Sequence, residues 1–348
     1  MHNTTDNKLP LLQLKDLSIG IHEKGQVYTA VDGISYNVYP GEILGVVGES
    51  GCGKTVTNLA IMGLLPEVLF VQGGEILYRT GDRADSPVID LAKCSPEERR
   101  KLNGSAMSII FQEPMTSLNP LMKVGKQAGE ALRIHKKLPS EEVRRRVLEA
   151  FEDVGLPDPE GSMEKYPHQL SGGQRQRVMI AMATLLNPRL LIADEPTTAL
   201  DVTIQAQVLA LLKKINREKN TSIIFISHDL AVIRQICDRV IVMYAGKIAE
   251  TGTTSDILER PVHPYTNGLI ASIPKASVKG RNLASIPGHV PSTEEKRLPC
   301  PFANRCVFSA NRCRTAPPKV YKLSDTHTCS CHYAVSFAAE YRNQERRQ

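Results

Sequence analysis

The chain has 348 residues, 41% of them hydrophobic and 23% charged, proportions that exclude overall disorder and predict one large domain with a smaller second unit. The net charge of +6 comes from basic residues scattered among acids, so no nucleic acid is expected as a partner. No apolar run reaches the roughly 18 residues of a membrane helix, and the polar N-terminus lacks a secretory signal pattern, so we expect a cytosolic chain with reduced thiols.

The first elements are expected to be β-strands. Leu11–Leu17 and Val27–Val38 alternate loosely between apolar and polar residues, as antiparallel strands do. Ile43–Val47 is a short apolar run that enters a glycine-rich loop, and Leu59–Leu65 continues beyond the loop with helical spacing. The order strand, loop, helix is therefore predicted for this part of the chain.

The loop between that strand and that helix matches G-x-x-x-x-G-K-[ST], the pattern of a phosphate-binding loop. Glycines allow backbone N–H groups to turn toward a phosphate, and the helix N-terminus adds positive potential. Lys54 is expected to reach the β- and γ-phosphates of a nucleotide, and the Thr55 hydroxyl to ligate Mg²⁺. The loop consists of Gly48, Glu49, Ser50, Gly51, Cys52, Gly53, Lys54 and Thr55.

The middle of the chain predicts an α/β fold. Residues 123–155 are charged and helical in pattern, with Ser140 as a capped helix start, and they belong to a helical subdomain at about 119–170. Helical stretches such as Val202–Glu218 then alternate with short apolar runs, which is typical of a parallel sheet covered on both faces. These runs are Leu190–Ala193, Ile223–Ile226 and Val240–Met243.

Two adjacent acids end one of these buried runs. Asp194 and Glu195 follow Leu190–Ala193, and acids placed there can face Mg²⁺ beside a phosphate loop. Asp194 is expected to hold the metal, and Glu195 to polarise the attacking water as general base. A purely structural role is disfavoured, because burying two carboxylates without a cation is costly.

The segment Leu170-Ser171-Gly172-Gly173-Gln174 resembles the signature sequence of the ABC ATPase family. The resemblance covers roughly residues 11–260 and implies a P-loop NTPase of ABC type with an antiparallel β subdomain and a helical subdomain. In that family the signature begins a helix that caps the γ-phosphate of ATP bound to the opposite subunit. Ser171, Gly172, Gly173 and Gln174 are thus expected to act on the ATP of a partner, with this chain as half of a dimer.

Other positions match the ABC family one by one. Gln112 resembles its Q-loop glutamine, expected to sense Mg²⁺ and to act in catalysis, and Ala199-Leu200-Asp201 resembles its D-loop. His228, just after a buried strand, resembles the histidine that contacts the γ-phosphate. Tyr28 is expected to stack on the adenine.

Longer stretches are similar to the dipeptide/oligopeptide/nickel importer subfamily, and most of all to the first ATPase subunits of dipeptide importers. Such subunits pair with a second homologous ATPase subunit, two transmembrane permease subunits and an external peptide-binding protein, and they lie at the cytoplasmic face of the membrane. The resemblance rests on residues 111–120, His263-Pro264-Tyr265-Thr266, Ser272-Ile273-Pro274, Ile286-Pro287-Gly288 and Val290-Pro291.

The resemblance predicts a subunit that hydrolyses ATP to power import of dipeptides or oligopeptides. Import of nickel or another small solute is an alternative, because an ATPase subunit does not touch the cargo. A soluble ABC ATPase of DNA repair or translation is the competing class. It is disfavoured because the chain has neither a long coiled coil nor a second ATPase unit.

A small C-terminal unit rich in cysteine is expected at 261–335, followed by a charged tail at 336–348. In a reducing compartment its cysteines indicate a metal site before disulfides. The spacing C-x₅-C-x₆-C-x₁₇-C lacks the close pairs of zinc knuckles, and on chemistry alone a [4Fe–4S] cluster and Zn²⁺ both remain possible. Free thiols or an adventitious disulfide are a further alternative. Resemblance to the importer extension favours the cluster, with Cys331 rather than Cys329 as last ligand. The predicted ligands are Cys300, Cys306, Cys313 and Cys331.

Overall fold

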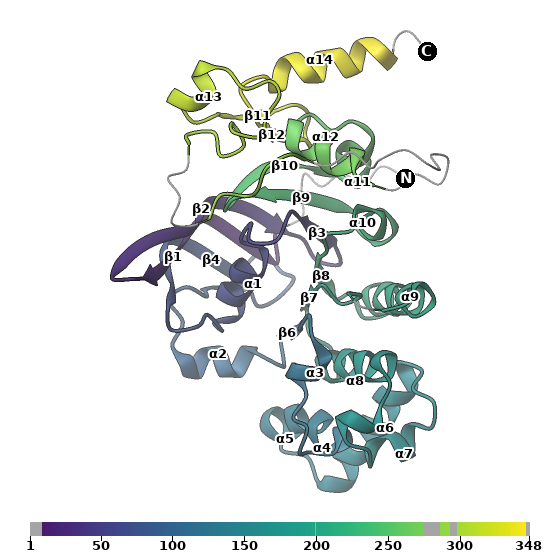
Figure 1. Ribbon diagram of the computed structural model, residues 1–348. Coiled ribbons are helices and arrows are strands. Elements are labelled where there is room, and N and C mark those ends of the chain that lie inside the picture. Colours follow the sequence, from purple (N-terminus) through teal and green to yellow (C-terminus); the bar gives the residue numbers. More distant parts are fainter. Residues whose placement is uncertain (1–8, 199, 274–285, 293–297, 346–348) are drawn as a thin grey trace.

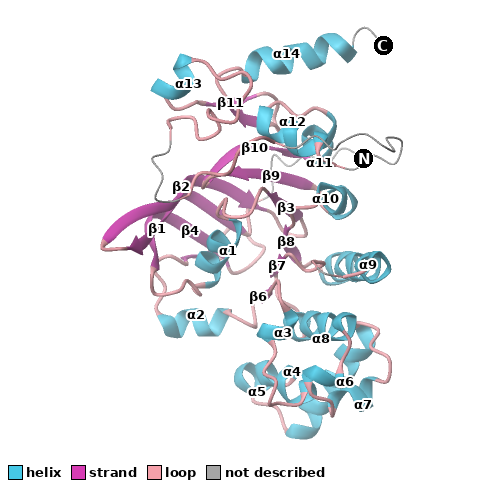
Figure 2. Ribbon diagram, viewed as in Figure 1, coloured by secondary structure: helices cyan, strands magenta, loops and turns pink. Residues whose placement is uncertain are grey.

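The computed structural model describes residues 9–198, 200–273, 286–292 and 298–345. Within these residues the strands form two sheets, and helices lie on both faces of the larger one and at its ends (Figures 1 and 2). Three expectations from the sequence fall partly outside this range: Ala199 of the D-loop, Pro274, and most of the segment between Ser272 and Ile286. The end of the predicted tail, residues 346–348, is also outside.

The larger sheet has eight described strands in the order β11-β12-β10-β9-β3-β8-β7-β6. The five consecutive strands from β9 to β6 in that order are parallel, so their carboxyl ends meet at one edge. The three strands at the other end pair antiparallel. The strands span β3 Ile43–Val47, β6 Met107–Ile110, β7 Leu190–Asp194, β8 Ser222–Ile226, β9 Arg239–Tyr244, β10 Lys247–Thr253, β11 Val320–Lys322 and β12 Thr328–Ser330.

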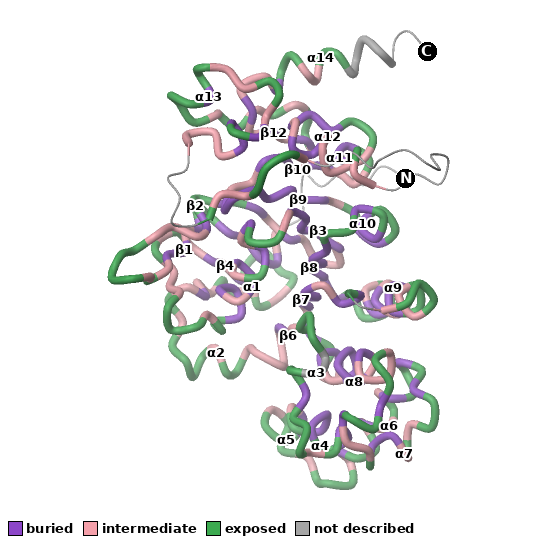
Figure 3. The backbone as a smooth tube through the Cα atoms, in the orientation of Figure 1, coloured by how far each residue is buried: buried purple, intermediate pink, exposed green. Residues whose placement is uncertain are grey.

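The central strands are buried on both faces, as their apolar runs predict. Strands β3, β7 and β8 are buried at every position. Because successive side chains of a strand point to opposite faces, each strand contributes to two cores. In β8, Ile223 and Phe225 join the core on the helical side, whereas Ile224 and Ile226 join the core on the other side. The buried strands form the middle of the molecule in Figure 3.

The smaller sheet has the order β2-β1-β4-β5 and is antiparallel throughout. It covers the face of the large sheet that carries α1, where its apolar side chains share one core with α1 and the inner strands. The predicted antiparallel subdomain is therefore confirmed. Its strands are β1 Leu12–Glu23, β2 Gln26–Val38, β4 Leu69–Arg79 and β5 Val88–Asp90.

The helices lie on both faces of the large sheet, and those between Pro114 and Thr184 form a helical part at one end of it (Figure 1). This part contains the predicted helical insertion. Its α6 begins at Ser140, but Ser140 is the first helical residue and not the cap: Pro139 is the N-cap, and no side chain caps this helix, so the predicted cap is wrong. The predicted helix at 202–218 is α9. The helices are α1 Lys54–Met62, α2 Pro96–Leu102, α3 Pro114–Ser117, α4 Val124–Ala128, α5 Glu130–Lys136, α6 Ser140–Asp153, α7 Pro159–Met163, η2 Pro167–Gln169, α8 Gly172–Thr184, α9 Val202–Lys219, α10 Leu230–Ile236, α11 Thr254–Glu259, α12 Pro264–Ala271, α13 Asn311–Thr315 and α14 Ala334–Glu345.

The C-terminal extension continues the core sheet. Strand β12 pairs with β10 through the register Glu250 to Cys329 and Thr251 to Thr328, and β11 pairs with β12. The buried Glu250 carboxylate accepts hydrogen bonds from the backbone N–H groups of Val262 and His263 and lies 2.7 Å from Nε2 of His327. The extension and the ATPase core are therefore joined by backbone pairing and a buried polar network.

No helix among the described residues is long and apolar enough to cross a membrane.

Candidate functional site

The phosphate loop leaves β3 and enters α1, as predicted. Gly53, the residue before α1, has φ 103°, and a Cβ there would lie 2.9 Å from Cγ2 of Val31, so a side chain would meet both backbone strain and a clash. A Cβ at Gly48 would lie 2.3 Å from the carbonyl oxygen of Met243. The loop thus needs glycine at both positions to take this shape.

Lys54 folds back over the loop. Its Nζ donates to the carbonyl oxygens of Gly48 at 2.7 Å and Glu49 at 3.1 Å and lies 3.6 Å from Sγ of Cys52. The side chain is buried, so its ammonium is held at the loop and away from bulk water. An ammonium held by backbone carbonyls can turn toward a phosphate without the loop having to rearrange.

Asp194 ends β7 next to this loop. Burial raises the pKa of its carboxyl, and the Thr55 hydroxyl and Lys54 oppose that rise. Its Oδ1 is buried and has no hydrogen-bond partner. A buried acceptor without a partner is costly unless a cation or water meets it. Asp194 and Thr55 thus offer the oxygen ligands that Mg²⁺ prefers, and the residues fit the predicted metal.

Glu195 lies at the centre of a polar cluster at the carboxyl edge of the sheet. Its Oε2 accepts from Nε2 of Gln112 at 3.1 Å and from Oγ1 of Thr198 at 2.9 Å, and lies 3.2 Å from Nδ1 of His228. Gln112, Glu195 and His228 follow β6, β7 and β8, whose ends meet because these strands are parallel and adjacent. The structure therefore brings the three predicted catalytic residues together.

Thr198 was not predicted from the sequence. Its only signal there is its place three residues after Glu195, and the contact depends on how the chain turns. The backbone of Glu195 has φ 46°, a conformation that is uncommon for a residue other than glycine. This strained turn directs the carboxylate back toward Thr198 and His228.

The signature segment begins α8 as predicted. Ser171 is the N-cap, and a capping box joins it to Gln174: the Gln174 backbone N–H donates to the Ser171 hydroxyl at 3.3 Å, and the Ser171 N–H to Gln174 Oε1 at 2.9 Å. Gly172 is exposed, with open space where a Cβ would be. Helices α1 and α8 contribute to cores on opposite faces of the large sheet. The action of the signature on the ATP of a partner stays a prediction.

Two further predicted residues occupy defined places. Asp201 is exposed and caps α9, accepting from the backbone N–H of Ile204 at 2.9 Å. The neighbouring Val202 is 83% exposed. Tyr28 lies on β2, and its hydroxyl donates to Gln26 of the same strand. The role of Asp201 as a D-loop residue and the stacking of Tyr28 on adenine stay predictions.

The four predicted cysteine ligands all lie in the extension, where Cys313 and Cys331 are buried. The Cys300 backbone N–H donates to the Cys313 carbonyl at 3.0 Å. Burial, reinforced by the nearby thiols of Cys300, Cys306 and Cys313, raises the pKa of Cys331 to about 11. Cys329 instead faces Glu250 and Cys331, so it lies apart from the other three.

Within the described part of the chain, no group of three or more His, Cys, Asp or Glu side chains is close enough to hold a metal ion. All eight cysteines are free thiols. The geometry of the described residues therefore gives the predicted metal centre no support.

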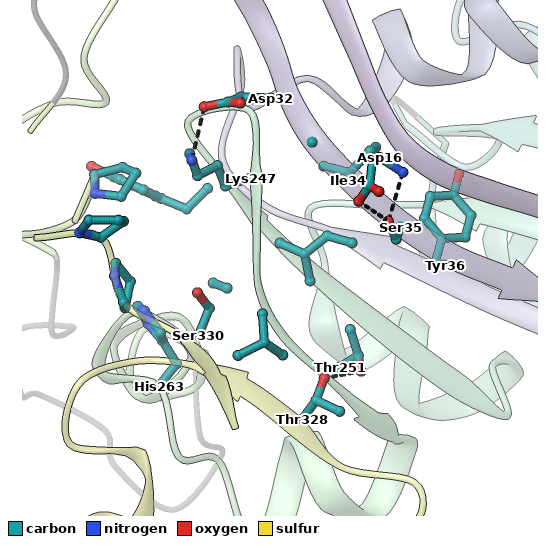
Figure 4. Close-up of a pocket in the computed structure, with 18 of the residues that line it drawn as sticks. Asp16, Asp32, Ile34, Ser35, Tyr36, Lys247, Thr251, His263, Thr328 and Ser330 are labelled. Atoms are coloured by element: carbon teal, nitrogen blue, oxygen red, sulfur yellow. Dashed lines mark hydrogen bonds and ion pairs between the residues drawn. The ribbon is translucent and has the colours of Figure 1, made fainter. Parts of the chain in front are cut away.

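A cavity of about 590 Å³ lies between β2, β10 and the extension (Figure 4). The ion pair of Asp32 and Lys247 at 2.9 Å stands at one side of it, and the hydroxyls of Thr251 and Thr328, 2.8 Å apart, at another. Cys300 lines it, but Lys54, Asp194 and Glu195 do not. The cavity is therefore distinct from the phosphate loop.

Two family models match separate parts of the chain. Residues 31–198 match the family described as ABC transporter, and residues 249–313 match the family described as oligopeptide/dipeptide transporter, C-terminal region. The second match includes Cys300, Cys306 and Cys313 of the extension.

Curated relatives match most of the chain. The dipeptide transport ATP-binding protein DppD of Bacillus subtilis is 47% identical over 92% of this chain and 94% of its own length. DppD of Escherichia coli is 42% identical over 95% of this chain and 98% of its own length. The oligopeptide transport ATP-binding protein OppD of B. subtilis is 47% identical over 91% of this chain and 87% of its own length.

Solved structures match the ATPase core. The ATP-binding cassette MJ0796, in a dimeric post-hydrolysis state bound to ADP and Pi, has a TM-score of 0.61 at 27% identity and covers 70% of this chain and 98% of its own. CbiO1 from Clostridium perfringens has a TM-score of 0.60 at 29% identity, and the match covers 72% of this chain and 91% of CbiO1.

Proposed function

Since the chain belongs to the ABC transporter family, among the ATP-binding subunits of the dipeptide and oligopeptide type, we propose that it binds MgATP and hydrolyses it to drive peptide import. The observation that supports this most directly is the convergence of Gln112, Thr198 and His228 on Glu195, beside the loop that holds Lys54. The relatives named above carry the description of dipeptide or oligopeptide transport.

The residues divide the hydrolysis reaction among them. Lys54 and the loop N–H groups bind the β- and γ-phosphates, and Thr55 and Asp194 would hold Mg²⁺, which supplies positive charge to the phosphate oxygens when bound. Glu195 takes a proton from the attacking water as its oxygen bonds to the γ-phosphorus and the bond to ADP breaks. Gln112 and Thr198 orient the Glu195 carboxylate, and His228 contacts the γ-phosphate.

The site is completed by a second ATPase subunit. Ser171, Gly172, Gly173 and Gln174 present the exposed N-terminus of α8, while the phosphate loop lies on the other face of the sheet, so each subunit's signature serves the other's nucleotide. The solved cassette with the likeness described above is dimeric. Closure of the two subunits on ATP is the movement that drives transport.

Two permease subunits and an external peptide-binding protein complete the transporter, which places this chain at the cytoplasmic face of the membrane. The helical part offers the permease an exposed apolar residue, since Leu121 is 85% exposed. Transport is tested in vesicles that contain the assembled complex and an entrapped or external labelled dipeptide. Uptake of Ni²⁺ but not of dipeptide would contradict the assignment of the cargo.

A [4Fe–4S] cluster in the extension is part of the proposal. Cys300, Cys306, Cys313 and Cys331 would hold it, and the match of residues 249–313 to the oligopeptide/dipeptide transporter C-terminal region supports the extension as its place. The cluster would cross-link four segments of the extension that are far apart in sequence.

A further inference from the structure

Arg305 of the C-terminal extension binds Glu49 of the phosphate loop, 256 positions earlier in the sequence. Nη1 of Arg305 lies 2.5 Å from Oε2 of Glu49, and Nη2 lies 3.0 Å from Oε1. The Arg305 side chain is 5% exposed and that of Glu49 is 31% exposed. A two-pronged pair of this kind fixes direction as well as distance, because both groups are planar.

The guanidinium of Arg305 is itself held by the extension and the sheet. Its Nε donates to the Pro287 carbonyl at 2.8 Å, and Nη2 donates to the Ile286 carbonyl at 3.1 Å. Its Cζ lies 5.7 Å from the centroid of the Tyr244 ring, in cation–π contact. Arg305 therefore reaches Glu49 as a rigid group and not as a flexible surface side chain.

A second contact holds the backbone of the same loop residue. The Glu49 N–H donates to the hydroxyl of the buried Tyr265 at 2.9 Å. The Tyr265 ring packs 5.4 Å from the ring of Phe302 and 4.7 Å from that of Tyr244, between centroids. Aromatic side chains of β9 and of the extension, which includes α12, thus form one cluster under the start of the phosphate loop.

Glu49 links these contacts of the extension to Lys54 of the nucleotide site. Its carbonyl oxygen is one of the two backbone acceptors of Lys54 Nζ, at 3.1 Å. Its carboxylate is also an anion inside a loop that must bind a polyanion. Arg305 neutralises it and directs it toward the extension, which lowers the repulsion that bound phosphates would meet.

We propose that Arg305 and Tyr265 are positioning residues of the nucleotide site: they preform the phosphate loop through Glu49, so the C-terminal extension is a working part of ATP binding. The inference rests on the proposed binding of MgATP by Gly48–Thr55. It assigns to the extension a task besides holding a cluster. A loop that is already ordered binds its ligand more tightly, because ordering costs less on binding.

The test measures the affinity of the full-length chain for MgATP by titration calorimetry, beside the midpoint of thermal unfolding without nucleotide. Arg305→Met is expected to weaken binding about tenfold, which corresponds to about 1.4 kcal/mol. The double variant with Glu49→Gln removes the stranded carboxylate and should recover most of that loss. Arg312→Met is the matched control, because Arg312 lies over the Tyr333 ring within the extension.

A KM measurement separates positioning from mere stability. In the assembled transporter, Arg305→Met should raise the KM for ATP and leave kcat near that of the wild type, whereas loss of folded protein would lower the apparent kcat and leave KM unchanged. If Arg305→Met does not fold, Tyr265→Phe is measured in the same way. It removes only the acceptor of the Glu49 N–H and should also weaken MgATP binding.

Three results would overturn the inference. They are wild-type affinity in Arg305→Met or its substitute Tyr265→Phe, equal weakening in Arg312→Met, and a double variant weaker than Arg305→Met alone. A wild-type chain that binds no MgATP would contradict the proposed function as well. Because that outcome concerns the wild type and the others concern variants, the two failures are distinguishable.

Discussion

Nδ1 of His228 lies 3.2 Å from Oε2 of Glu195, joining residues that follow two neighbouring parallel strands. The Glu195 side chain is 15% exposed and that of His228 is 62% exposed. The carboxylate is thus sheltered and held, while the imidazole remains accessible from outside. This is the arrangement expected of a base that acts on water and of a histidine that contacts the γ-phosphate of an arriving nucleotide.

Replacing the base should separate binding from hydrolysis. Glu195→Gln keeps the size of the side chain but cannot take up a proton, so phosphate release by the assembled transporter should fall by about 10²- to 10⁴-fold. MgATP affinity should be retained. Thr198→Ala removes one donor to the same carboxylate and should cost less. Hydrolysis at wild-type rate in Glu195→Gln would show that another group is the base.

Stability should fall in acid because of His263. Burial lowers the pKa of this histidine to about 4, and its Nδ1 accepts from the Tyr265 N–H at 3.1 Å, which requires the neutral ring. Below pH 6.5 the imidazole of His263 binds a proton in the unfolded chain but not in the folded chain. Stability is therefore full above pH 6.5 and is lost progressively as the pH falls to 4, by at most about 3 kcal/mol.

This prediction is checked by chemical unfolding of the wild type and His263→Gln between pH 7 and pH 4. The variant has no imidazole to protonate, so its free energy of unfolding should depend less on pH across this window. Glu250 and His327, which lie in the same buried network, are the same in both proteins. Equal pH dependence of the two proteins would contradict the role of His263.

Docking of the permease should depend on Leu121. Leu121→Asp places a charge on an exposed apolar site of the helical part, and we expect loss of co-purification with the permease and of stimulated ATPase activity. MgATP binding by the isolated chain should not change, because Leu121 is remote from the phosphate loop. Ile134→Asp is the matched control, since Ile134 is 56% exposed on α5 of the same part. Equal loss in both variants would show general damage to the helical part.

The cysteine ligands are tested by anaerobic purification with iron and sulfide assays. We expect about four irons and four sulfides for each chain, and their loss in Cys313→Ser. Cys329→Ser should keep the cluster, because Cys329 is not a predicted ligand and pairs with Glu250 in the sheet. A colourless protein that contains zinc and no iron would contradict the cluster and support the alternative.

Much of the nucleotide site could be predicted because its parts are local in sequence. The loop that contains Lys54 needs glycine at set positions, the cap at Ser171 needs Gln174 three residues on, and each buried run ends at a strand edge. Since adjacent parallel strands end together, Gln112, Glu195 and His228 could be expected near one another. Thr198 could not, because its contact depends on the strained backbone of Glu195.

The sequence by itself determined the ATPase core, its phosphate loop and signature, and the group of cysteines, since short-range spacing and strand periodicity encode all of these. Only the tertiary structure decided that the extension continues the core sheet through β12, and that Arg305 and Tyr265 hold Glu49. The reason is physical. Arg305 and Glu49 are 256 positions apart, and such a contact depends on how the buried aromatic cluster packs, which no local pattern specifies.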